Sequence, residues 1–126
     1  MIEIMDNNNI TYKLGRNAKE NFFLIDEAND INENYWWFHL EDNPSGHCIV
    51  HSEQMDKTIA IVAGNLVKSY SKLKDVKKVK VIYTQLKNVT KTKTIGEVHL
   101  LVKPNIISIW TNKKIYNKQY FFKKIW

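Results

Sequence analysis

The sequence contains only one cysteine, four glycines and two prolines in 126 residues. A single cysteine excludes an internal disulfide and supplies no CxxC pair for zinc. The start of the chain, MIEIMDNNN, lacks the basic and apolar segments of a signal peptide. The longest apolar stretch, TIAIVAGNLV, is far shorter than the ~20 residues that a membrane span needs. No repeat or Pro/Ser-rich linker divides the chain, so we expect one intracellular domain over residues 1–126, without a membrane partner or a cofactor.

Charge of one sign is scarce in each half of the chain. Residues 1–67 carry four Lys/Arg and eleven Asp/Glu, a net charge of −7. Residues 68–126 carry fifteen lysines against Asp75 and Glu97, a net charge of +13, which gives the whole chain its charge of +6. This polarity predicts one strongly positive face and a polyanionic partner such as a nucleic acid. A basic face that is only solvated is the alternative.

The periodicity of the apolar residues predicts an α+β fold, a mostly antiparallel β-sheet with two main helices packed on one of its faces. Asp56 or Ser52 is the expected cap of the second helix, and Tyr70 continues its apolar stripe toward the core. The core is expected over about residues 10–110, and residues 111–126 form a basic, aromatic C-terminal tail. The predicted strands cover residues 10–14, 35–40, 47–51, 77–84, 97–103 and 105–110, and the predicted helices cover residues 16–30 and 56–73.

Aromatic residues are concentrated in the segment YWWFHL, which is typical of a strand. The turn signal EDNPSG follows, and HCIVH is the expected partner strand of a hairpin. A period of two places His47, Ile49 and His51 on one face of this partner strand, and Cys48 and Val50 on the other. Three consecutive aromatic residues cannot all face one way, so at least one of them is expected to be buried.

The sequence offers no pattern of catalytic or metal-binding residues. His47 and His51 are about 13 Å apart along an extended strand, too far to share one zinc ion. Cys48 lies in the middle of an apolar strand, where a cysteine is usually a small buried hydrophobe rather than a nucleophile. Acidic pairs such as Asp26–Glu27 are adjacent and point in different directions, and neither GxGxxG nor GxxxxGK is present. We therefore expect no metal and no enzymatic activity.

Binding of nucleic acid fits the composition better than catalysis does. Lysines contact phosphates without reading sequence, and exposed aromatic rings stack on unpaired bases. Three segments combine the two residue types, YSKLK, KNVTKTK and the tail NKKIYNKQYFFKKIW. The tail has two alternative interpretations, an additional strand or a disordered basic arm.

Five motifs follow one another along the chain: GRNAKEN (15–21), WFHLEDNPSGH (37–47), YSK (70–72), VKVIYT (79–84) and VTKTKTIGEV (89–98). In this order they resemble the NFACT-R domain, the RNA-binding module of ribosome quality-control proteins related to the bacterial fibronectin-binding-like family. The resemblance covers about residues 10–110. The chain departs from the family pattern at Tyr35, where an Asp is usual, and at Ser45–Gly46, which reverses the usual Gly-Ser order.

The resemblance implies a nucleic-acid-binding surface at the matching positions. These are Arg16, Asn17, Lys19, Asn21, His39, Ser45, His47, Lys72, Lys74, Lys91 and Lys93. The first four would lie at the start of the first helix, where free backbone N–H groups favour phosphate. The two histidines flank the hairpin turn and would donate to a phosphate or a 2′-OH; a hydrogen bond that orders the turn is their alternative role. The lysines would complete a basic rim.

The resemblance predicts a stand-alone module that binds structured RNA, tRNA or rRNA, by charge and shape in a translation or ribosome quality-control context. Ribosome-associated proteins are further candidate partners. DNA is an alternative ligand, because an isolated copy of the domain opens a eukaryotic coiled-coil protein that binds DNA. A second alternative is a protein-interaction adaptor without catalytic activity. The sequence contains no glycosylase-like or coiled-coil region, so recruitment of tRNA for C-terminal tailing is not implied.

Overall fold

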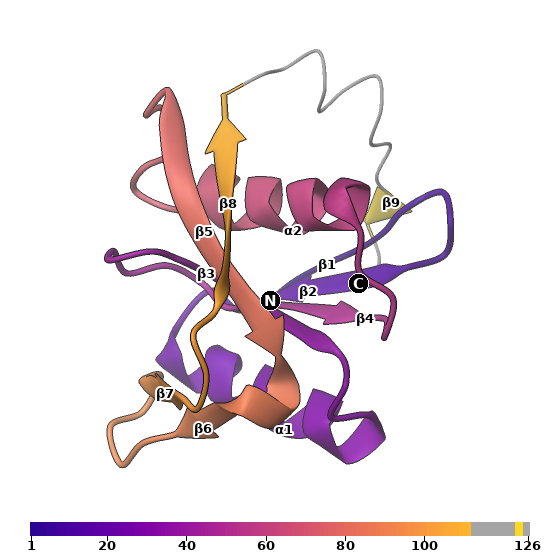
Figure 1. Ribbon diagram of the computed structural model, residues 1–126, viewed down its shortest axis with the longest axis vertical. Coiled ribbons are helices and arrows are strands. Elements are labelled where there is room, and N and C mark those ends of the chain that lie inside the picture. The colour runs from indigo at the N-terminus through magenta and orange to yellow at the C-terminus, as the bar shows by residue number, and fades with distance from the viewer. Residues whose placement is uncertain (112–122, 125–126) are drawn as a thin grey trace.

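The computed structural model describes residues 1–111 and 123–124. A seven-stranded antiparallel sheet has the strand order β8-β5-β3-β4-β2-β1-β9, and β6 and β7 form a separate two-stranded sheet (Figure 1). The helices are α1 (Ala18–Ile31), α2 (Lys57–Ser69) and the short 3-10 helix η1 (Leu86–Asn88). The strands are β1 (Ile2–Met5), β2 (Thr11–Leu14), β3 (Trp36–Leu40), β4 (Cys48–His51), β5 (Lys78–Gln85), β6 (Val89–Lys91), β7 (Val98–Leu100), β8 (Asn105–Trp110) and β9 (Lys123–Lys124). Within the described residues, none of the helices has the length and hydropathy needed to cross a bilayer.

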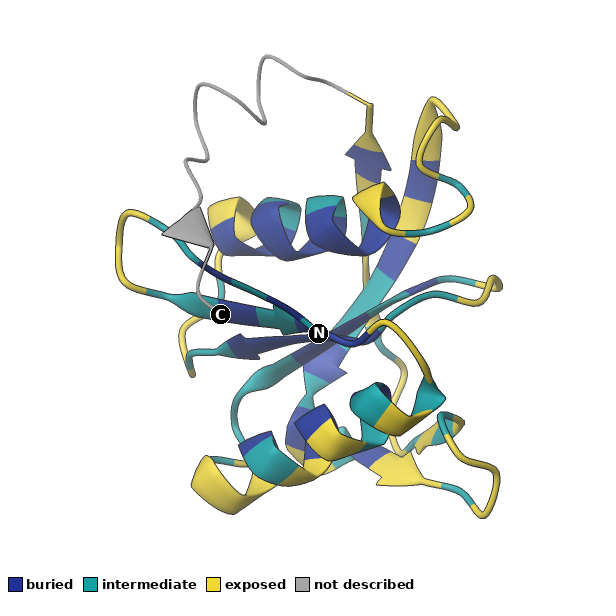
Figure 2. Cartoon of the chain, turned by 180° about the vertical axis from the view of Figure 1, so that it is seen from behind, coloured by how far each residue is buried: buried dark blue, intermediate teal, exposed yellow. Residues whose placement is uncertain are grey.

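The predicted α+β class is confirmed, but the prediction that both helices pack on one face of the sheet is wrong. The helices lie on opposite faces, α2 on one side and α1 on the other (Figure 2). Phe38 and Leu40 of β3 pack in the α2 core, whereas Trp37, the residue before Phe38, packs with α1. Successive side chains of a strand point to opposite faces, so a strand covered on both faces is apolar at consecutive positions. The runs WWF and CIV in the two central strands have this character.

The second helix begins as predicted and ends earlier. The side chain of Asp56 caps it by accepting a hydrogen bond from the backbone N of Ile59 at 2.8 Å. The helix stops at Ser69, and a tight turn follows in which the backbone N and the hydroxyl of Ser71 both donate to the carbonyl of Lys68. Tyr70 is therefore turned outward and 49% exposed, so its predicted place in the core is wrong.

The sequence-based interpretation missed two short strands, β1 and β6. β1 pairs antiparallel with β2, with Ile2 opposite Leu14, and buries Ile2 and Ile4 in the α2 core. The turn between the two strands is held by Asp6, whose carboxylate accepts hydrogen bonds from backbone N–H groups and from the hydroxyl of Tyr12. The predicted tail at 111–126 lies outside the described residues apart from Thr111 and β9, which pairs with β1.

Candidate nucleic-acid interface

Seven of the eleven predicted site residues line one cavity of about 480 Å³, which we call the α1 cleft. It lies where the start of α1, the turn between β3 and β4, and the segment after α2 meet. The seven residues are Arg16, Asn17, Asn21, His39, Ser45, His47 and Lys72. Tyr70, Ser71 and the loop around Gly96 complete the lining. Four of the five motifs that resemble the NFACT-R domain therefore meet at this cavity, and VKVIYT (79–84) does not line it.

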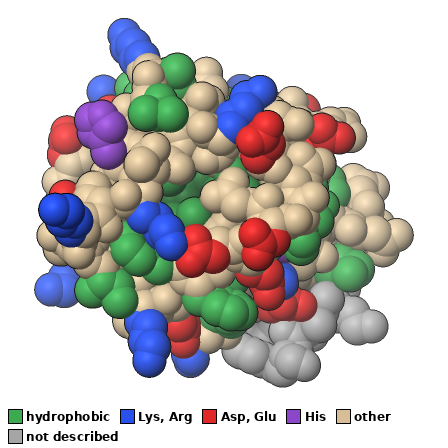
Figure 3. All heavy atoms as spheres, turned by 90° about the horizontal axis from the view of Figure 1, so that it is seen from below, with side chains coloured by type: hydrophobic (Ala, Val, Ile, Leu, Met, Phe, Trp, Pro, Cys, Tyr) green, Lys and Arg blue, Asp and Glu red, His purple; other side chains and the backbone are tan. Residues whose placement is uncertain are grey.

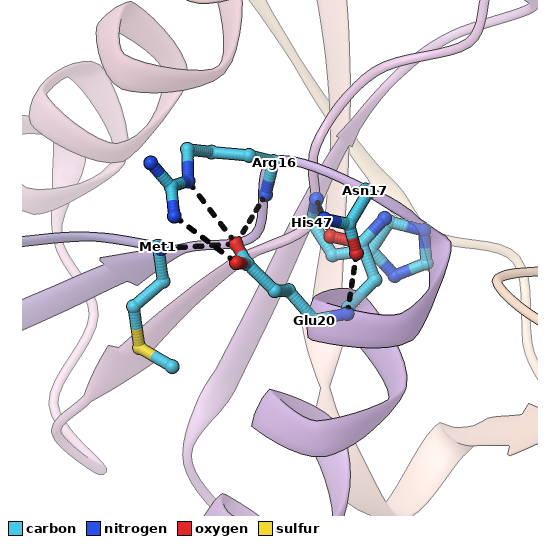
Figure 4. Close-up of polar contacts among 6 residues, drawn as sticks. Met1, Arg16, Asn17, Glu20 and His47 are labelled. Atoms are coloured by element: carbon cyan, nitrogen blue, oxygen red, sulfur yellow. Dashed lines mark hydrogen bonds and ion pairs between the residues drawn. The ribbon is translucent and has the colours of Figure 1, made fainter.

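The start of α1 is hydrogen-bonded through Asn21 to His47, the residue that precedes β4. The buried side-chain oxygen of Asn21 accepts a hydrogen bond from the backbone N of His47 at 3.0 Å, and Gly15 N donates to the carbonyl of His47 at 3.1 Å. A Cβ at Gly15 would overlap the side-chain oxygen of Asn21, so this close approach requires glycine. Asn17 caps the helix, and its side chain accepts from Glu20 N at 2.9 Å (Figure 4). Asn21 therefore positions the cleft wall, while Asn17 is exposed at its edge.

Removal of the hydrogen bond between Asn21 and His47 should measurably lower the stability of the domain. Asn21→Ala leaves the buried N–H of His47 without an acceptor, which should lower the free energy of unfolding by about 1–3 kcal/mol. Asn29→Ala is the matched control, because Asn29 lies exposed on the same helix and should change stability by less than about 0.5 kcal/mol. Urea denaturation of both variants measures the difference. Equal stabilities of the two would contradict the positioning role of Asn21.

The two histidines of the cleft have defined proton positions. Trp37 Nε1 donates to His47 Nδ1 at 3.0 Å, which places the proton of neutral His47 on Nε2. Burial, with a smaller contribution from His39, lowers the pKa of His47 to about 3, so this ring is neutral at physiological pH. Nδ1 of His39 lies 2.6 Å from the carbonyl of Leu40 and donates to it, and burial lowers the pKa of His39 too. Neutral His39 thus keeps Nε2 as an acceptor, which suits a ribose 2′-OH better than a phosphate.

The only arginine of the chain is paired rather than free. Arg16 contacts the carboxylate of Glu20 through Nε at 3.3 Å and Nη2 at 3.2 Å (Figure 4). The amino group of Met1 also lies 3.0 Å from Glu20. Hydrogen bonds from Arg16 and Met1 lower the pKa of Glu20 to about 2, so it is ionised at physiological pH. One carboxylate, that of Glu20, faces two cations, and the Arg16 side chain is 58% exposed. A phosphate that binds Arg16 therefore has to compete only with a solvated ion pair, which is weak.

Comparison with known proteins decides the family. The family model for the NFACT protein RNA-binding domain matches residues 3–100. The chain belongs to the NFACT RNA-binding domain family. It is 29% identical over 85 residues to the Rqc2 homolog RqcH of Bacillus subtilis, a match that covers 65% of this chain and 14% of that protein.

A solved structure has the same fold. The C-terminal part of the fibronectin/fibrinogen-binding protein from Streptococcus suis superposes with a TM-score of 0.78, at 17% identity, over 90% of this chain and 46% of that one. The chain thus spans less than half the length of either protein.

The lysines of this NFACT domain are dispersed. Of those predicted to bind, only Lys72 lines the α1 cleft, while Lys19, Lys74 and Lys93 are exposed outside it. Lys91 Nζ pairs with Asp26 at 2.6 Å and lies over the ring of Phe22. Seen from the side of α1, β6 and β7, Lys/Arg and Asp/Glu side chains are interspersed around a hollow with apolar side chains at its centre (Figure 3). This view shows no continuous positive face.

Tyr70, Ser71 and Gly96 are cleft residues that sequence reasoning did not assign to the site. The YSK and TIGEV motifs of the NFACT resemblance contained them, so a signal was present. Gly96 has φ +84°, and a Cβ there would press on Ala18 at the start of α1. Among the described residues there is no cluster of three His, Cys, Asp or Glu side chains that could hold a metal ion. Burial raises the pKa of the Cys48 thiol, so this residue is not a thiolate nucleophile.

Proposed function

We propose that this NFACT domain binds structured RNA, tRNA or rRNA, at the α1 cleft, in the context of ribosome quality control. RNA binding is the described role of the family whose model matches residues 3–100. The observation that carries the proposal is the convergence of seven residues from separate motifs of the chain on one cavity. The similarity to RqcH, a homolog of Rqc2, supports the ribosomal context.

Each part of the cleft has a chemical role in this proposal. Arg16 and Lys72 contact phosphates from two separate segments of the lining, since one precedes α1 and the other follows α2. Tyr70, half exposed beside them, offers a ring for an unpaired base. His39 accepts a hydrogen bond from a 2′-OH, which favours RNA over DNA of the same sequence. His47 and Asn21 hold the wall in place without touching the ligand, because both are almost fully buried.

Removal of the two cleft cations is the direct test. Arg16→Ala/Lys72→Ala should weaken tRNA binding and flatten the dependence of log K on log salt by about one for each lost phosphate contact. The matched control is Lys57→Ala/Lys87→Ala, which removes two exposed lysines outside the cleft. Binding of labelled tRNA and of a DNA duplex is measured by fluorescence anisotropy at about 50 and 200 mM salt. Equal losses in the two double variants, or equal affinity for tRNA and DNA, would reject the cleft as an RNA site.

A further inference from the structure

One part of the main sheet is uncovered on the face opposite α2. Val79 and Val81 of β5 and Ile109 of β8 pack under α2. Their alternate neighbours point to the other face, where α1 packs on β2, β4 and η1 instead. Figure 1 shows β5 and β8 in front, with α2 behind them. The outward residues are Lys78 and Lys80 of β5 and Ile106, Ser108 and Trp110 of β8, all of them exposed; together they form what we call the β5–β8 surface.

The residues of this surface are arranged in cross-strand pairs. Lys78 lies opposite Trp110 and Lys80 lies opposite Ser108. The ammonium group of Lys78 lies 5.1 Å from the centre of the Trp110 ring, and 51% of this tryptophan is exposed. Within the described residues neither lysine forms an ion pair. Cations and an aromatic ring are thus presented side by side.

The β5–β8 surface leads toward the α1 cleft. Ile106 lies directly opposite Ile82, and Ile82 lines a second cavity of about 470 Å³ with Trp37 and Leu100. This cavity and the α1 cleft share a wall that includes His39 and Gly96. An extended ligand that crosses β8 at Trp110 can therefore continue over Ile106 to the wall of the cleft.

We infer that the β5–β8 surface binds unpaired nucleotides of single-stranded RNA, with a base stacked on Trp110 and phosphates held by Lys78 and Lys80. Lysines about 7 Å apart on alternate positions of a strand, beside an exposed ring, suit a backbone with a base attached at each unit. Charge complementarity favours a polyanion as the occupant, since the surface has two cations and no acid of its own. The inference relies on the proposed function only for the identity of the polyanion as RNA.

Stacking and charge contacts are separated by the choice of probe. Labelled oligouridine of about ten nucleotides, within the site sizes usual for single-strand binding, is compared with an abasic RNA backbone of the same length. The full chain and its variants Trp110→Ala and Trp110→Phe are titrated with both probes by fluorescence anisotropy. Trp110→Ala should weaken binding of oligouridine about tenfold and leave binding of the abasic strand unchanged. Trp110→Phe should keep most of the affinity for oligouridine, and unchanged binding of the abasic strand by Trp110→Ala shows that this variant is folded.

The cation variant completes the test. Lys78→Gln/Lys80→Gln should weaken both probes and flatten the salt dependence, because phosphates are present in both. If Trp110→Ala binds oligouridine as tightly as wild type, or loses the two probes equally, the inference is wrong. Arg16→Ala/Lys72→Ala with tRNA is measured in parallel. If Arg16→Ala/Lys72→Ala loses affinity for tRNA while Trp110→Ala keeps its affinity for oligouridine, the β5–β8 surface alone is rejected. If Trp110→Ala loses affinity for oligouridine while Arg16→Ala/Lys72→Ala keeps its affinity for tRNA, the cleft alone is rejected.

Discussion

The free energy of unfolding should rise steeply as the pH is raised from about 3 to 6.5. In the folded protein the pKa of His47 is about 3 because the ring is buried, whereas the ordinary value is 6.5. Between these two pH values the unfolded chain binds more protons at this residue than the folded chain does, so stability increases with pH. The slope for one such group approaches 1.4 kcal/mol per pH unit, which amounts to a loss of about 4 kcal/mol when the pH falls from neutral to 3.

Other groups act in the same direction. Burial also lowers the pKa of His39 and His51, so each of them favours the folded state above its ordinary pKa. A loss of several kcal/mol is a large part of the 5–15 kcal/mol that stabilises a typical domain. We therefore expect unfolding in mild acid, before the folded-state pKa of His47 is reached.

Urea denaturation at intervals between pH 4 and about 7 measures this slope. His47→Gln keeps an acceptor for Trp37 and removes the titrating ring, so its stability should depend less on pH than that of the wild type, whatever its absolute stability. His99→Gln is the matched control, because it makes the same substitution at an exposed position on β7. If the free energy of unfolding of His47→Gln changes with pH as steeply as that of the wild type, His47 is not the source of the pH dependence.

The hairpin of β3 and β4 was the part of the fold most accessible from sequence. Its turn is marked by Asn-Pro and Ser-Gly, and the period of two placed Ile49 opposite in face to Cys48 and Val50, as the structure confirms. The positions of the helices were not accessible from the same pattern. The periodicity of a helix in the sequence shows that the helix has an apolar stripe, but it does not show which face of the sheet that stripe covers. The consecutive apolar residues of β3 carried that information, since only a strand covered on both faces needs them.

The predicted residues of the helix start and the hairpin turn come together in the α1 cleft, whereas Lys74, Lys91 and Lys93 of the predicted rim do not line it. Motif residues at a helix start and a tight turn are fixed by local backbone geometry, as for Asn17 and Ser45. The pairing of a lysine depends on distant parts of the chain, and Lys91 meets Asp26 across a separation of 65 residues. The number of lysines in the second half could not reveal this. Tyr70 was misassigned for a related reason, since the apolar period continues past Ser69, whereas the chain turns there and Ser71 hydrogen-bonds the carbonyl of Lys68.

Trp37, which supports the wall of the α1 cleft through His47, should be the most costly single side chain to remove near the candidate site. It is 1% exposed, packs with α1, stacks on His39 with ring centres 5.7 Å apart, and donates to Nδ1 of His47. Trp37→Ala leaves a cavity under α1 and should lower the free energy of unfolding by about 3–5 kcal/mol. The His47–His39 wall of the cleft loses its support in the same change.

Trp37→Phe separates the hydrogen bond from the packing. Phenylalanine keeps most of the buried ring but leaves Nδ1 of His47 without a donor, which should cost about 1–3 kcal/mol. Trp36→Phe is the matched control on the same strand, because Trp36 is only half buried and donates to the carbonyl of Glu53 at an exposed position. Urea denaturation at neutral pH should therefore find Trp37→Phe clearly less stable than Trp36→Phe. If the two variants are equally stable, the Trp37–His47 hydrogen bond does not hold the wall of the cleft, and the support must come from ring packing alone.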